Sequence, residues 1–285
     1  MKLFMLWDME GTSGIFTREQ VWYWEEGVRP EVAADGKALL MADINTATTA
    51  ALAAGVDEVI VCDTHGGGGN IVLDRMVQDP RVSYLPRSRG FQDGKFRWLP
   101  GLDESVDGFL VPGHHAMAGT PNTFLPHTWN LDWGDFRING VSVGEMGIEA
   151  CFAGHWGIPT IFASGDEVAC REAEGMFPGI VTAAVKRPLD HDHCEGLVPE
   201  AAHVLLAEKV TEAVARLRAG ECRAFQPELP MLMSVRMTSP ESVDALATRP
   251  GITRRDDCTL EAVLERRCDV VNWLIGTGLD MPDPE

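Results

Sequence analysis

Three segments of this chain have the pattern of short buried strands, and each ends directly in side chains that bind metal ions. Asp8 and Glu10 follow residues 2–7, Asp63 and His65 follow residues 58–62, and His114 and His115 follow residues 108–111. In an open α/β sheet, ligands gather at the carboxyl ends of the strands, where the loops form a crevice. Carboxylates and imidazoles that converge there form an oxygen- and nitrogen-rich metal site. The sequence therefore indicates a metal site, and with it a hydrolase.

The spacing of these residues decides which side chains reach the same crevice. Asp8 and Glu10 are two residues apart, so an extended backbone points both in one direction, and the second pair shares this spacing. His114 and His115 are adjacent, so we expect only one of them to face the crevice. Glu145 is predicted to open a helix, where a carboxylate is favoured by the helix dipole even without a metal.

Other histidine motifs are weaker candidates, and we interpret them as structural. The His191-Asp192-His193 motif has the HxH form of many metal sites, but its polar surroundings predict a solvated loop. His155 falls at a predicted helix end and His203 lies inside a predicted long helix. We therefore leave all three segments outside the predicted site.

A glycine-rich and an aromatic-rich segment are two further candidates for a binding role. Residues 66–69 resemble a phosphate cradle, but no Lys-Ser or Lys-Thr pair follows them, so they do not form a P-loop. We expect these glycines to allow a close approach of the backbone to the site. The cluster of Trp22, Tyr23 and Trp24 is expected in the core or at a subunit interface rather than in a pocket.

Short apolar runs alternate with longer amphipathic segments, which predicts an α/β domain. Strands are predicted at residues 2–7, 58–62, 108–111 and 160–163, and helices at about 36–54, 144–154, from 166 onward, and 197–218. Asn139-Gly140 is a favoured type I′ turn pair and predicts a hairpin over 136–143. Residues 219–230 resemble a linker. We therefore expect a metal-binding α/β catalytic domain at 1–218 and a smaller α+β portion at 219–285.

The composition limits the partners and the compartment. The chain has 285 residues, 45% hydrophobic and 24% charged, which is typical of a globular protein. A formal charge of −19 argues against nucleic acid or an anionic membrane as partner, since both require a basic surface. Seven scattered cysteines, without a CxxC pair, fit reduced thiols. With no signal peptide or membrane-spanning run in the pattern, we expect a cytoplasmic protein.

Several ordered motifs of this chain resemble the DppA-type D-aminopeptidases. They are LWDMEGTSG at residues 6–14, CDTHG at 62–66, GHHAMAGTP at 113–121 followed by Pro126-His127, and NGVSVGEMG at 139–147. Softer matches follow at residues 163–166 and 182–186. The resemblance covers roughly residues 1–190, and the C-terminal third matches much less clearly.

The resemblance implies a zinc-dependent, self-compartmentalising aminopeptidase with a three-layer α/β/α fold and a mostly parallel sheet. It implies two Zn²⁺ ions per subunit, assembly into a homodecamer, and short peptides or amino acid amides, with D-residues at the N-terminus, as substrates. The implied ligands are carboxylates and histidines, which also suit Mn²⁺ or Co²⁺ in vitro. Carried over by motif, the catalytic residue is His127 and the metal ligands are Asp8, which bridges the ions, Glu10, His65, His115 and Glu145. Asp63 is expected to orient a ligand.

Three other functions remain compatible with parts of this pattern. A metal-dependent amidohydrolase that acts on a non-peptide amide needs the same ions and a different pocket. A metallophosphoesterase also uses paired metals, but it usually needs an Asn-His ligand step that this chain does not show in order. The third alternative is a metal- or peptide-binding oligomer that catalyses no reaction. Assays with D- and L-aminoacyl amides, dipeptides and phosphate esters separate these possibilities.

Overall fold

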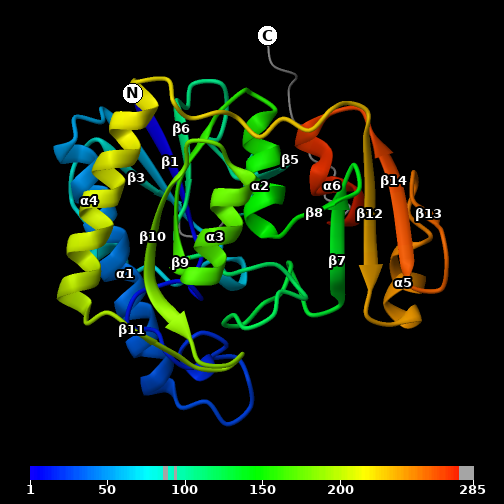
Figure 1. Ribbon diagram of the computed structural model, residues 1–285, viewed down its shortest axis with the longest axis horizontal. Coiled ribbons are helices and arrows are strands. Elements are labelled where there is room, and N and C mark those ends of the chain that lie inside the picture. The colour runs from blue at the N-terminus through cyan, green and yellow to red at the C-terminus, as the bar shows by residue number, and fades with distance from the viewer. Residues whose placement is uncertain (86–88, 93–94, 276–285) are drawn as a thin grey trace.

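The computed structural model describes residues 1–85, 89–92 and 95–275, and a seven-stranded sheet forms the centre of that part of the chain (Figure 1). The strand order is β11-β10-β9-β6-β1-β2-β3, and every neighbouring pair is parallel except β10 with β11. The strands are β1 (Lys2–Trp7), β2 (Glu58–Asp63), β3 (Val82–Leu85), β6 (Gly108–Val111), β9 (Thr160–Asp166), β10 (Val181–Pro188) and β11 (Cys194–Gly196). The predicted α/β class with a mostly parallel sheet is confirmed.

Helices cover both faces of this sheet and make three layers (Figure 1). Helices α1 (Pro30–Ala53) and α4 (Pro199–Arg218) pack on one face, and α2 (Glu145–Gly154) and α3 (Glu167–Met176) pack on the other. Side chains of β1 alternate between the two cores: Leu3 and Met5 face α1 and α4, whereas Phe4 and Leu6 face α2. A strand buried on both faces is apolar throughout, which explains why β1 was predicted with its observed bounds.

A second sheet of five antiparallel strands lies beside α2, in the order β13-β14-β12-β7-β8 (Figure 1). Its elements are β7 (Trp133–Ile138), β8 (Val141–Ser142), β12 (Met231–Met237), β13 (Thr253–Arg254) and β14 (Thr259–Leu264), flanked by α5 (Pro240–Leu246), the 3₁₀ turn η4 (Arg267–Val270) and α6 (Asn272–Ile275). Strands β4 (Arg89–Gln92) and β5 (Lys95–Trp98) form a separate hairpin. Because β7 pairs with β12, the sheet of the C-terminal portion includes a hairpin from the middle of the chain. A boundary at residue 218 stays a prediction.

One predicted helix has a different start in the structure, and one observed strand was not predicted. Helix α1 begins at Pro30, earlier than predicted, because its first turns are largely exposed and carry no apolar period, while proline suits the first helical position. Strand β10 was not predicted as a strand, since its alanines and lysine have low β propensity and only their position between β9 and β11 favours pairing.

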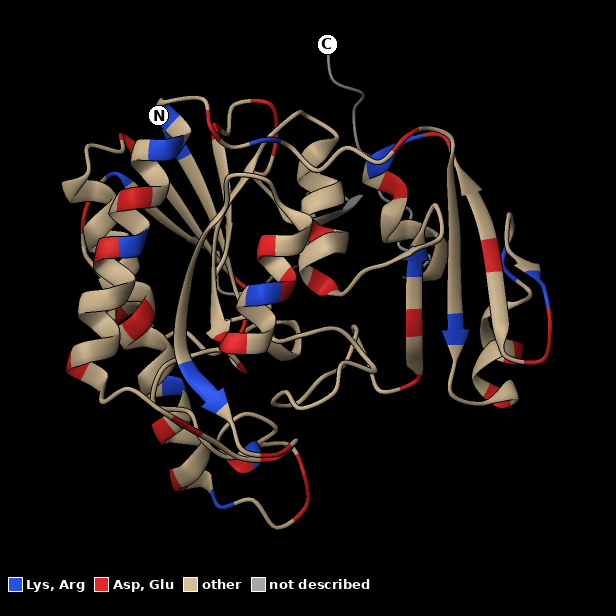
Figure 2. Cartoon of the chain, in the orientation of Figure 1, with Lys and Arg blue, Asp and Glu red and all other residues tan. Residues whose placement is uncertain are grey.

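The surface agrees with the strongly acidic sequence. Figure 2 shows Asp and Glu distributed over the helices and loops beside both sheets, whereas the central strands carry few charges. All seven cysteines lie in described segments and are free thiols. No helix among the described residues is long and apolar enough to cross a membrane.

The candidate site forms where the strand order reverses. From β1 the chain continues to β2 and β3 on one side, and it later returns to β6 on the other side of β1. The chain therefore leaves β1 and β6 in opposite directions at the carboxyl edge of the sheet. This edge is the usual ligand position in such sheets. Two backbone hydrogen bonds join these loops, from Asp8 N to Pro112 O at 3.2 Å and from Gly11 N to Gly113 O at 2.7 Å.

We predict that Gly113→Ala strongly destabilises the fold. Gly113 has φ = 75°, and a Cβ atom there would overlap the carbonyl oxygen of Asp8. Gly140→Ala is the matched control, because Gly140 has φ = 82° but open space around it. The control should lose about 1–2 kcal/mol of unfolding free energy from backbone strain alone. Gly113→Ala should lose more than about 3 kcal/mol, measured by denaturant unfolding. Equal losses for the two variants would show that the loops do not need this close contact.

Candidate metal centre

The loops after β1 and β2 bring Asp8, Glu10 and His65 together. Nδ1 of His65 lies 2.9 Å from Oδ1 of Asp8 and 3.2 Å from Oε2 of Glu10. All three side chains are buried. They form one group whose ligand atoms lie close enough to hold a single metal ion.

The loop after β6 and the start of α2 supply a second group, which again includes Asp8. Nε2 of His115 lies 3.5 Å from Oδ2 of Asp8 and 3.3 Å from Oε1 of Glu145. Asp8, His115 and Glu145 are likewise close enough to hold one ion. Asp8 therefore presents Oδ1 to the first group and Oδ2 to the second, which is the arrangement required of a carboxylate that bridges two ions.

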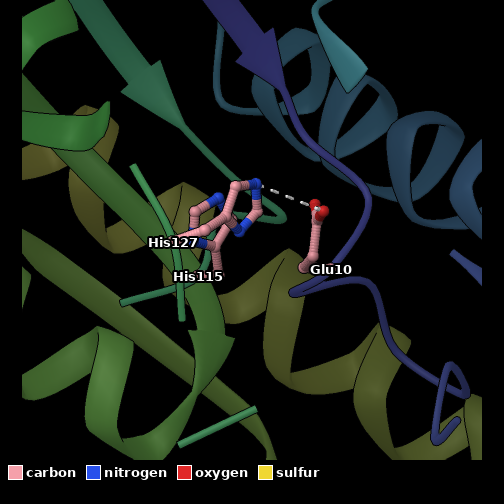
Figure 3. A group of neighbouring side chains, drawn as sticks. All are labelled: Glu10, His115 and His127. Atoms are coloured by element: carbon pink, nitrogen blue, oxygen red, sulfur yellow. Dashed lines mark ion pairs between the residues drawn. The ribbon is translucent and has the colours of Figure 1, made fainter. Parts of the chain in front are cut away.

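His127 lies over both groups. Its ring stacks on that of His115, with centroids 3.8 Å apart and an interplanar angle of 11°. Its Nε2 atom is 3.6 Å from Oε1 of Glu145 and 4.0 Å from Oε1 of Glu10, and Figure 3 shows this side chain facing Glu10 beside His115. Glu10, His115 and His127 also form a compact group of potential ligands. The geometry alone thus places His127 at the site, either as a ligand or as a group that transfers protons.

Backbone carbonyls fix the orientation of all three imidazoles. Nε2 of His65 lies 3.1 Å from Val21 O, and Nδ1 of His115 and of His127 each lie 2.9 Å from the carbonyls of Ala116 and Leu125. A carbonyl only accepts hydrogen bonds, so each of these ring nitrogens carries the proton. The other nitrogen of each ring is directed at the carboxylates, and in its deprotonated form it would offer its lone pair to a metal ion.

The cluster contains buried polar atoms that a cation would satisfy. Oε2 of Glu10 and Nε2 of His115 are buried and make ion-pair contacts of 3.2 and 3.3 Å, but neither atom makes an aligned hydrogen bond in the described part of the chain. A buried polar atom without a partner costs about 1–3 kcal/mol. The donor set of carboxylate oxygens and imidazole nitrogens, without cysteine, is one that Zn²⁺ accepts. The residues present therefore fit a metal centre.

The charges of the cluster stabilise one another. Burial alone would raise the pKa of Glu10, but His65 and other imidazoles nearby hold it well below its ordinary value. Burial also acts to raise the pKa of Glu145, and His115 outweighs it and lowers that pKa to about 2. For His65, the neighbouring carboxylates overcome burial and raise the pKa well above its ordinary value. Both glutamates are thus ionised at neutral pH, the form that binds a cation.

The remaining predicted residues lie near the cluster or outside it. Asp63 accepts hydrogen bonds from the backbone and side chain of Asn70, whose side chain also donates to His65 O at 2.9 Å, so Asp63 supports the His65 loop through Asn70. His114 packs away from the cluster, with Nε2 2.8 Å from Oε2 of Glu149. The segment of residues 191–193 is outside the three groups of potential ligands, and so is His203, which pairs with Asp43.

Trp22 lies in the hydrophobic core, as predicted, but it also borders the site, and so does the exposed Trp24. Trp22 and Trp24 line a cavity of about 430 Å³ that opens over the candidate ligands. Nε1 of Trp22 donates to Oε1 of Glu10 at 3.0 Å, and Trp24 lies beside the His65 ring at 5.3 Å between centroids. Only the three-dimensional structure reveals that these two tryptophans contact Glu10 and His65.

The sequence did not single out Glu149 and Lys186. Glu149 lies one helical turn after Glu145 on α2 and lines the same cavity, and burial raises its pKa to about 7. Nζ of Lys186, on β10, donates to Glu10 O at 2.5 Å and to Ile15 O at 2.8 Å from a buried position. The i, i+4 spacing from Glu145 is a signal for Glu149, whereas Lys186 appeared only within the softer family match at residues 182–186.

Comparisons with known proteins agree with one another. The family model of the D-aminopeptidases, peptidase family M55, matches residues 1–275. The D-aminopeptidase of Bacillus subtilis (strain 168) is 33% identical over 215 residues, which are 75% of this chain and 74% of that protein. The solved structure of the Zn-dependent D-aminopeptidase DppA from Bacillus subtilis, described as a self-compartmentalizing protease, matches with a TM-score of 0.87 at 26% identity. That match covers 97% of this chain and 96% of that chain.

The fold and the cluster of carboxylates and imidazoles define a metal-dependent aminopeptidase, a hydrolase of peptide or amide bonds. Within that class, the chain belongs to the D-aminopeptidase family. The resemblance drawn from the sequence motifs is confirmed, and it extends beyond residue 190, where the motifs had become indistinct.

We predict that Lys186→Met weakens the metal centre as well as the fold. The change leaves two buried carbonyls, of Glu10 and Ile15, without their donor, which should cost about 2–3 kcal/mol of unfolding free energy. It also frees the loop that carries Glu10, so metal affinity should fall roughly 10–100-fold in calorimetric titration. Lys209→Met removes a lysine that pairs with Glu212 at the surface of α4 and should change neither quantity appreciably. Unchanged metal affinity in Lys186→Met would contradict this role.

Proposed function

We propose that this chain is a two-zinc D-aminopeptidase that removes N-terminal D-residues from short peptides or amino acid amides. One ion is held by Asp8, Glu10 and His65 and the other by Asp8, His115 and Glu145. The observation that carries this proposal is the position of Asp8, whose two oxygens face different histidines. The zinc dependence and D-specificity of the Bacillus subtilis relatives support it. Mn²⁺ and Co²⁺ are expected to substitute in vitro.

The residues of this chain have distinct roles in the proposed reaction. Paired zinc ions, when bound, polarise the scissile carbonyl and activate a water molecule. Because Nδ1 of His127 donates to Leu125 O, its Nε2 atom is the one that accepts the proton of the water and returns it to the leaving amine. Trp22 holds Glu10 through the indole N–H and forms an edge-on contact with the His127 ring, so it positions both groups.

We also propose that the chain forms a homodecamer and works in the cytoplasm. The relative of known structure is described as self-compartmentalizing, which supports an assembly that encloses its active sites. The mass in solution, measured by light scattering, should be near ten times that of the 31.1 kDa chain. A stable monomer that is fully active would contradict an assembly of this kind.

Metal content and substrate preference test the central proposal on the same sample. Protein purified without chelator should contain about two zinc ions per chain and release the N-terminal residue of D-alanyl peptides faster than that of L-alanyl peptides. A chelator should abolish the activity, and added zinc should restore it. Two bound metals without peptide hydrolysis would move the substrate to a non-peptide amide. Protein that binds no metal even after reconstitution would refute the two-ion site.

His127→Ala separates catalysis from metal binding. We expect turnover to fall at least about 100-fold, because the proton-transfer group is lost, while the zinc content stays at the wild-type level. His193→Ala, which changes an exposed histidine paired with Asp190, should retain normal activity. Normal turnover in His127→Ala would remove this residue from the mechanism, and loss of one zinc would make it a ligand instead.

A further inference from the structure

The cavity contains a carboxylate that belongs neither to the proposed metal ligands nor to an arginine pair. Five acidic residues line it: Asp8, Glu10, Glu25, Glu145 and Glu149. Three of them are proposed ligands, and Glu25 binds Arg18 through two contacts of 2.6 and 2.9 Å. Glu149 is the remaining one, and it is 2% exposed.

The contacts of Glu149 hold its carboxylate in one position. Oε2 lies 2.8 Å from Nε2 of His114, and Nδ1 of His114 lies 3.1 Å from Pro112 O. His114 is fully buried and does not line the cavity, so it supports Glu149 from the side of the core. This contact engages Oε2 from the side of the core, while the residue itself borders the cavity.

Two indole rings accompany Glu149 in the cavity wall. Trp98 and Trp129 both line the cavity, with ring centroids 5.4 Å apart. The described lining includes no lysine or arginine that could pair with Glu149, and its two histidines, His65 and His127, belong to the metal centre. A cavity that offers both a carboxylate and indole rings suits an ammonium group, which can gain a charge-assisted hydrogen bond and a cation–π attraction.

The distance between Glu149 and the metal centre indicates which ammonium group of a substrate would reach Glu149. Glu145 and Glu149 are four residues apart on α2, so their Cβ atoms lie about 5–6 Å apart on one face of the helix. The amino nitrogen of an N-terminal residue is two bonds from the carbonyl carbon that is attacked. A substrate with its carbonyl beside Glu145 therefore brings its N-terminal nitrogen toward the next turn of the helix.

We propose that Glu149 binds the N-terminal ammonium group of the substrate and thereby restricts the enzyme to the ends of chains. This inference rests on the proposed aminopeptidase function. An internal peptide bond presents an acylated, uncharged nitrogen at this position, which offers Glu149 no charge-assisted hydrogen bond from the cavity. Glu149 thus acts as a specificity-determining residue, and His114 positions it.

Glu149→Gln, which keeps the shape and removes the charge, tests the proposal with a pair of substrates. D-Alanine p-nitroanilide has the N-terminal ammonium group, and propionic acid p-nitroanilide has the same scissile bond without it. The wild-type enzyme should prefer the amine in kcat/KM, and Glu149→Gln should reduce that preference at least tenfold with unchanged metal content. Glu149→Asp keeps the charge and should recover part of the preference. Glu172→Gln, a change at a half-buried carboxylate of α3 that does not line the cavity, should leave it unchanged.

The possible failures are distinguishable. If the wild-type enzyme hydrolyses neither substrate nor any D-alanyl peptide, the proposed function fails. If it hydrolyses the amine and Glu149→Gln keeps the full preference, the role of Glu149 is refuted. A fall in activity that is equal for both substrates also refutes it, since it indicates a structural effect alone. N-Acetyl-D-lysine p-nitroanilide tests a side-chain ammonium: hydrolysis that depends on Glu149 would replace the N-terminal group with a basic side chain and overturn the proposal. If Glu149→Gln does not fold, two other measurements decide in the same way. One is the preference of Glu149→Asp for the amine substrate, and the other is the affinity for D-alanine relative to propionate, measured by calorimetry.

Discussion

The carboxylate of Asp8 lies between His65 and His115, and each of its oxygens faces one of the two imidazoles. This position exists because β1 is the central strand at the reversal of strand order, with β2 on one side and β6 on the other. The loops after all three strands therefore meet around the end of β1. The shared carboxylate also explains why two groups of ligands lie so close together that an ion in one would lie beside an ion in the other.

Holding these loops together requires backbone contacts that side chains would prevent. The backbone amides of Asp8 and Gly11 bond to the loop after β6, and a Cβ atom on Gly11 or Gly113 would overlap backbone atoms of the facing loop. Glycine is the residue that permits so close an approach. Lys186 adds a buried cation that ties the loop of Glu10 to β10. These contacts hold the buried carboxylates and imidazoles at short distances from one another. Without such pairing, the burial of their charges would lower the free energy of unfolding.

Helix α2 links the metal centre to the pocket beside it. Its first residue, Glu145, faces His115, and its next turn presents Glu149 to the same cavity. The second sheet packs against the same hydrophobic core as α2, and β7 leads through β8 directly into this helix. The C-terminal portion therefore supports the helix that carries one proposed ligand and one proposed specificity residue, although it supplies neither of them.

The sequence by itself determined the strands β1 and β6 with their observed bounds, the α/β class and the family, because apolar runs and ordered motifs are local in the chain. It also predicted that Asp8, Glu10, His65 and one of His114 and His115 lie together, since strand ends of a parallel sheet meet at one edge, and the family resemblance added His127 and Glu145. The tertiary structure alone decided the pairing of β7 with β12, the contact of Trp22 with Glu10 and the positions of Lys186 and Glu149. These features depend on contacts between residues far apart in the sequence, or on which face of a helix borders the cavity.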